Sequence, residues 1–149
     1  MILHIGVIDV PEPEGSTTGE VADKLEEKYG IFTAFIESNL PFIVDRITES
    51  AAGALDDALN GVKTQGVFER AGDLITTRFK EFISLQEVEK LGIKGTPTMA
   101  ALMGISYRTA SGLTSTKVRG RKYKRVYGAR RPSFIYSGAF QASLKCWVE

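Results

Sequence analysis

The chain has 149 residues, of which 43% are apolar and 25% charged, so it can pack one core and is not expected to be disordered. No apolar run approaches the ~20 residues of a membrane helix, and the first residues lack the basic start of a secretory signal. One cysteine and one histidine, Cys146 and His4, exclude an internal disulfide and argue against Cys- or His-rich metal sites and His-dependent nucleophilic catalysis.

The N-terminal third predicts a strand followed by a capped helix. Residues 1–10 are rich in Ile and Val, and the PEPEG segment at 11–15 ends the strand, because proline cannot donate to a ladder. Thr17 with Glu20 three residues later is typical of a capping box. We expect a short amphipathic helix from there to about Gly30.

Two longer helices are predicted next. Asn39 and Pro41 mark the start of one that ends near Gly61, with residues 31–37 as a helical lead-in bent at the proline. Another should run from about residue 67 to residue 91. Its apolar face, which we interpret as core packing, consists of Phe68, Leu74, Ile75, Phe79, Phe82, Ile83 and Val88.

Charge is divided unevenly along the chain. Residues 1–89 contain 17 acidic and 7 basic side chains, a balance of −10, whereas residues 90–149 contain 12 basic ones and one acid, a balance of +11. Chance clustering with a solvated basic loop is one interpretation. The other is a polar subunit whose acidic and basic faces meet nucleic acid or the next subunit of an assembly.

The basic segment at residues 107–131 includes KVRGRKYKRVYGARR and shows no apolar periodicity. We therefore expect a long basic loop that is mobile or becomes ordered on a partner. Arg130 and Arg131 adjoin the folded end of the chain and are predicted to lie in a subunit interface. The cations predicted to contact a DNA channel or a partner are Lys117, Arg119, Arg121, Lys122, Lys124 and Arg125.

The C-terminal end predicts two short strands, at 133–136 and 143–148, around a turn at Gly138. The last strand should lie beside the N-terminal one, with Cys146 as a buried, inert thiol and His4 as a structural histidine. The side chains assigned to the sheet side of the core are Phe134, Phe140, Leu144 and Trp147.

These elements indicate a single α+β domain over residues 1–149, with two or three long helices packed on a small antiparallel sheet. Its parts are an acidic helical region at about 17–92, the basic loop at 107–131 and the C-terminal strands at 132–149. Nothing in the pattern favours catalysis. The adjacent Asp56 and Asp57 point about 100° apart on a helix, so they are interpreted as solvated surface.

One pattern favours a different function. Ala100, Gly104, Ala110 and Leu113 have the spacing of a helix-turn-helix, and a basic stretch follows. Against it, the second helix would contain Gly112 and five Ser or Thr residues, which are poor helix formers. A sequence-specific DNA-binding protein that uses residues 99–113 is therefore the alternative, and an RNA-associated basic protein is a third possibility.

The C-terminal end resembles a known family. RPSFI at 131–135, followed by SGAFQASL at 137–144, is similar to the glycine-containing signature of phage tail-completion and neck proteins of long-tailed bacteriophages. The resemblance implies a structural virion protein of the head–tail connector, a tail-completion, stopper or tail-terminator subunit that forms a ring around the DNA channel. It implies no cofactor, contacts with portal or tail-tube proteins, non-specific DNA contact, and a place in the virion after assembly in the host cytoplasm.

Overall fold

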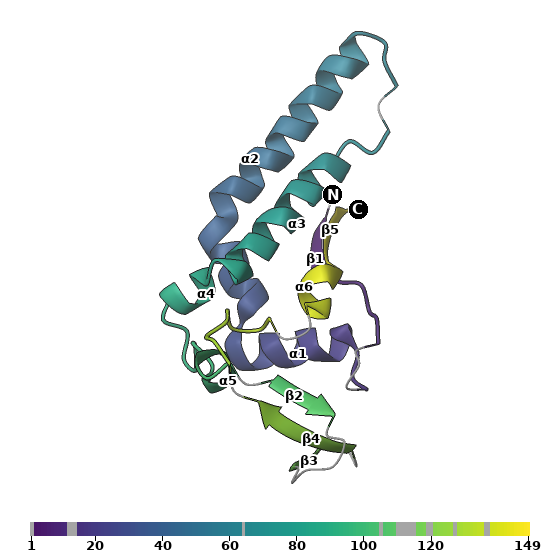
Figure 1. Ribbon diagram of the computed structural model, residues 1–149. Coiled ribbons are helices and arrows are strands. Elements are labelled where there is room, and N and C mark those ends of the chain that lie inside the picture. Colours follow the sequence, from purple (N-terminus) through teal and green to yellow (C-terminus); the bar gives the residue numbers. More distant parts are fainter. Residues whose placement is uncertain are drawn as a thin grey trace.

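The computed structural model describes residues 2–11, 15–63, 65–104, 106–109, 116–118, 121–126, 128–135 and 138–149, those between 106 and 126 by their backbone. They form an α+β fold, as predicted (Figure 1). In chain order its elements are β1 (Leu3–Val7), α1 (Thr18–Tyr29), α2 (Ile31–Leu59), α3 (Glu69–Ser84), α4 (Glu87–Lys90), α5 (Met99–Leu102), β2 (Ser106–Thr109), β3 (Thr116–Val118), β4 (Arg121–Val126), α6 (Ala139–Ser143) and β5 (Leu144–Val148).

The first helix agrees with its sequence signals, and the second is longer than expected. The Thr17 hydroxyl accepts a hydrogen bond from the Glu20 N–H, and Gly30 ends α1 in the left-handed conformation. The predicted helical lead-in at residues 31–37 is confirmed, but it is part of α2 itself: the helix begins at Ile31 and continues through Pro41, so the predicted start near Asn39 is wrong. The Glu26 carboxylate accepts the Phe32 N–H at 2.7 Å and so caps α2 from the preceding helix.

The predicted helix over 67–91 is divided into two. α3 ends at Ser84, Gln86 has a left-handed backbone (φ 60°), and α4 follows. A bidentate ion pair joins them, with Arg78 nitrogens 2.9 and 2.7 Å from the two Glu87 carboxylate oxygens. The change of direction lets Val88, which is 1% exposed, reach the core.

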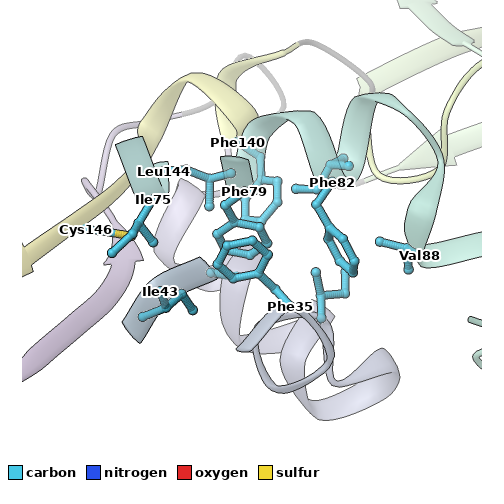
Figure 2. Packing of buried hydrophobic residues seen from close by; sticks show 12 residues of the cluster. Phe35, Ile43, Ile75, Phe79, Phe82, Val88, Phe140, Leu144 and Cys146 are labelled. Atoms are coloured by element: carbon cyan, nitrogen blue, oxygen red, sulfur yellow. The ribbon is translucent and has the colours of Figure 1, made fainter. Parts of the chain in front are cut away.

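Most of the apolar face predicted over 67–91 forms the centre of the core (Figure 2). The prediction is wrong for Leu74, which is 38% exposed, and Phe68 is not part of the buried cluster. Phe79 of α3 is fully buried and stacks on Phe35 of α2 with ring centres 4.2 Å apart, while Phe32 meets it edge-on at 5.2 Å. Phe140 and Leu144 cover this group from the C-terminal end, as predicted. Burial of these apolar side chains is the main stabilising contribution to the helical body.

The two ends of the chain pair as predicted. β1 and β5 form an antiparallel ribbon in which Leu3 lies opposite Val148 and Val7 opposite Leu144. β5 packs closely on α3, since a Cβ at Gly72 would lie 2.8 Å from the Cys146 carbonyl oxygen. On the same edge the Cys146 N–H donates to the Thr76 hydroxyl at 2.9 Å.

The remainder of the C-terminal prediction needs correction. Residues 133–135 are a turn rather than a strand, while 136 and 137 lie outside the described residues. Gly138, with φ of 79°, precedes the short helix α6 instead of a hairpin turn. The left-handed conformation explains why glycine suits this position.

The basic segment contains strands, so the prediction of a loop over 107–131 is wrong for the described residues there. β2, β4 and β3 form a three-stranded antiparallel sheet, in that order. Its base is close-packed, because a Cβ at Gly104 would meet the Ala129 carbonyl oxygen. Residues Ser106–Thr109 form a strand, β2. This contradicts the helix-turn-helix alternative, which requires a second helix there.

Candidate interaction surfaces

The basic sheet collects most of the cations that the sequence singled out. Lys117 lies in β3, and four others lie in β4, whereas Arg119 is outside the described residues. In the register, Lys117 is opposite Lys122, and Lys124 is opposite Arg108, a residue that the sequence analysis did not single out. Strand register is a long-range property, so no local signal near Arg108 could have identified it.

The register also sorts these cations between the two faces of the sheet. Directly opposite residues share a face and neighbours along a strand alternate, so Arg108, Lys117, Lys122 and Lys124 belong to one face. Arg121 and Arg125 of β4 belong to the other face, together with Tyr107 and Tyr123.

Arg130 and Arg131, predicted to lie in a subunit interface, make contacts within the chain. A guanidinium nitrogen of Arg130 lies 2.7 Å from the Glu89 carboxylate, although the arginine side chain is 52% exposed. The Arg131 guanidinium donates to the carbonyl of Ile135. The described structure therefore gives both residues a structural role, and their part in an interface stays a prediction.

Glu89 joins α4 to the C-terminal segment and is an acid-sensitive point of the fold. It accepts hydrogen bonds from the Ser133 hydroxyl at 2.7 Å and the Ser133 N–H at 3.1 Å, besides the ion pair with Arg130. Burial raises the pKa of Glu89, but the bonds from Ser133 and Arg130 outweigh burial and hold its pKa below the usual value.

We expect Glu89→Gln to lower the free energy of unfolding by about 1–3 kcal/mol at pH 7, because glutamine is neutral and keeps only one of the two accepting oxygens. A carboxylate with a depressed pKa stabilises the fold above its unfolded pKa, and this stabilisation is lost as pH falls through the folded value. Urea unfolding between pH 7 and pH 3 should therefore show a weaker acid dependence in the variant, with exposed Glu27→Gln as control. An unchanged acid dependence would contradict this role.

A stripe of exposed apolar side chains follows one side of α2. Ile36, Leu40 and Val44 are between 39% and 52% exposed, and Leu55 and Leu59 reach 62% and 77%. Their helical spacing places them on a face adjacent to the one that packs on α3. Several large apolar side chains exposed on one side of a helix mark a protein contact more often than a single exposed residue does.

Acidic side chains accompany this apolar stripe. α2 contains five acids and a single base, Arg46, which pairs with Glu49 at 2.6 Å. Asp45 and Asp56 are exposed. The connection from α2 to α3 lies at one end of the molecule and the basic sheet at the other (Figure 1). The last turns of α2, which contain Asp56 and Asp57, therefore lie far from the basic sheet, whereas the acidic helix α1 lies nearer to that sheet.

Trp147 corrects a core prediction. Its side chain is 43% exposed and stacks on the ring of His4, with ring centres 5.1 Å apart. Cys146 is buried as predicted, and burial raises the pKa of its thiol. The sequence could have predicted the exposure of Trp147. Alternate residues of a strand share a face, and the neighbours of Trp147 on its face, Lys145 and Glu149, are both charged.

We therefore expect Trp147→Ala to cost about 1 kcal/mol or less, the size of an exposed aromatic stack. Phe140→Ala should cost about 3–5 kcal/mol, because Phe140 is 4% exposed. Thermal or urea unfolding of the two variants side by side measures the difference. Equal losses of stability would mean that Trp147 is a core residue after all.

The described part of the chain was searched for metal-binding groups and for membrane-spanning helices. There, no group of three or more His, Cys, Asp or Glu side chains is placed to hold a metal ion. No helix in the described ranges is long and apolar enough to cross a membrane. The surfaces that stand out are therefore the basic sheet, the stripe on α2 and the ribbon of β1 and β5.

Comparison of the chain with protein-family models, curated proteins and solved structures finds no match.

Proposed function

We propose that this chain is a structural subunit of a phage head–tail connector, a tail-completion, stopper or tail-terminator protein that forms a ring around the DNA channel. The observation that carries the proposal is that α2, which is acidic and carries exposed apolar side chains, extends away from the basic sheet toward the opposite end of the molecule. The resemblance of residues 131–144 to neck proteins agrees with it.

Separate, complementary surfaces on one subunit favour a head-to-tail contact, in which the same two patches meet at every interface. Such heterologous contacts close into rings when the rotation between subunits allows it. Complementary charge steers the encounter and discourages other arrangements. A ring of this kind requires no catalytic group.

The basic sheet has two possible occupants within this proposal, the DNA in the channel and the acidic surface of a neighbour. For the cations between residues 117 and 125 we favour DNA, because lysine and arginine hold phosphates without reading sequence. The subunit would then act at the head–tail junction of the virion, after assembly in the host cytoplasm, against portal or tail-tube proteins.

Binding to unrelated DNA duplexes at several salt concentrations tests this assignment. We expect equal affinity for different sequences and a steep fall with salt, with a log–log slope of up to about −5 if six cations meet phosphates. A strong preference for one duplex would support a regulator instead. Absence of binding at low salt would remove DNA as the occupant of the sheet.

A further inference from the structure

One edge of the ribbon carries backbone groups that have no partner among the described residues. The Ile2 and Ile8 N–H groups donate to the carbonyls of Glu149 and Ser143, the residues that flank β5, and so close the two ends of the ladder. Because an antiparallel ladder uses alternate residues, His4 and Gly6 also face β5, and the N–H and C=O groups of Leu3, Ile5 and Val7 face the opposite side. Within the described ranges, no hydrogen bond involves these six groups.

A groove runs along this open edge. It has a volume of about 460 Å³, and β1 forms one wall while α1 and the start of α2 form the other. The apolar lining is Ile5, Val7, Ala22, Phe32 and Ile36, and the charged lining residues are Asp23 and Glu26, both acids. On the opposite side of the ribbon, β5 packs on α3, where the Cys146 N–H donates to the Thr76 hydroxyl and the Cys146 carbonyl lies against Gly72.

We propose that the open edge of β1 binds the edge strand β2 from the basic sheet of a second copy, which adds to the ribbon as a third strand. The proposal rests on the ring function proposed above and specifies how one subunit holds the next. In strand addition, backbone hydrogen bonds supply the affinity and the side chains in the groove select the partner.

Three observations favour a second copy as the occupant. The charged residues lining the groove are acidic, whereas β2 includes Arg108 and belongs to a sheet whose charged residues, where described, are all basic. β2 is an edge strand of four residues, long enough to reach Ile5 and Val7. Ile36 lines the groove and also begins the apolar stripe of α2, so the two surfaces are continuous.

A proline at position 7 tests the edge selectively. Val7→Pro removes one outward-facing N–H, and proline is similar to valine in size. Edge strands tolerate proline at positions where the N–H faces away from the sheet. Val7→Thr is the matched control, because it keeps the N–H. We expect both variants to fold, as circular dichroism can check, and Val7→Pro to raise the concentration for half-assembly in sedimentation velocity about tenfold above that of Val7→Thr. Assembly of Val7→Pro at the wild-type concentration would overturn the proposal.

Hydrogen exchange tests strand addition on the wild-type protein, without any substitution. Assembly should slow exchange of the Leu3, Ile5 and Val7 amides. Assembly that leaves these amides as fast as in the monomer would overturn strand addition and leave the ring function standing. A wild type that stays monomeric at every concentration and salt would overturn both.

Charge exchange identifies the partner strand. Asp23→Lys and Arg108→Glu should each weaken assembly, and the double variant should recover part of it, whereas Asp23→Asn should have a smaller effect than Asp23→Lys. No recovery in the double variant, with each single variant impaired, would overturn β2 as the added strand.

Discussion

Replacing Phe79 with alanine is expected to lower the free energy of unfolding by about 3–5 kcal/mol. Phe79 is fully buried and its ring contacts both Phe35 and Phe32, so alanine leaves a cavity at the junction of α2 and α3. A domain of this size is stabilised by only about 5–15 kcal/mol, so the variant would keep little reserve. Urea unfolding followed by circular dichroism measures the loss.

The matched control for this prediction is Leu59→Ala on the same pair of helices. Leu59 is 77% exposed, so its removal should change the stability of the monomer by about 0.5 kcal/mol or less. If the stripe on α2 is a subunit contact, the same variant should weaken assembly. A large loss of monomer stability in Leu59→Ala, or a small one in Phe79→Ala, would show that the packing in Figure 2 is not the core.

The second large effect is expected on the basic sheet. Lys117, Lys122 and Lys124 share one face in the register, so alanine at all three should remove most of that face's charge. We expect DNA affinity to fall by a similar factor for every duplex and the salt slope to decrease by about 3, because each lysine neutralises one phosphate. Arg121→Ala with Arg125→Ala, on the other face, is the control that tells which face meets DNA.

The same triple variant separates DNA contact from subunit contact. If the face lines a channel, rings should still form and the defect should appear as poor DNA retention. If it contacts the acidic surface of a neighbour, assembly itself should fail, and charge reversal at Asp56, Asp57 or Glu49 should restore it. Asp56 is the cleanest of these positions, since Glu49 already pairs with Arg46. Intact assembly with unchanged DNA retention would contradict both roles.

Local signals predicted the parts of this fold that depend on neighbouring residues. The cap at Thr17, the left-handed end at Gly30 and the apolar face that contains Phe79 are short-range patterns, and the structure confirms all three. Local signals predicted helix on both sides of Pro41 but placed a helix start at Asn39 instead of one helix from Ile31. The single helix from Ile31 depends on capping by Glu26 of another helix and on burial of Phe35.

The surfaces were harder to predict than the core. The strands of the basic sheet lack apolar alternation, so their pairing depends on a register between segments that no local pattern encodes. The open edge of β1 depends on which residues of this strand form hydrogen bonds with β5. That pairing cannot be read from the sequence alone. The division of charge along the chain was visible from the start, but only the fold shows that the end of α2 and the basic sheet lie at opposite ends of the molecule.

The most direct test of a ring-forming neck subunit is its mass in solution together with negative-stain images of the protein mixed with portal or tail-tube protein. We expect a mass that is a multiple of 16.3 kDa and rings, or incorporation of the protein into a neck. A protein that remains monomeric and never joins either partner, or a dimer that binds one duplex selectively, would contradict this function.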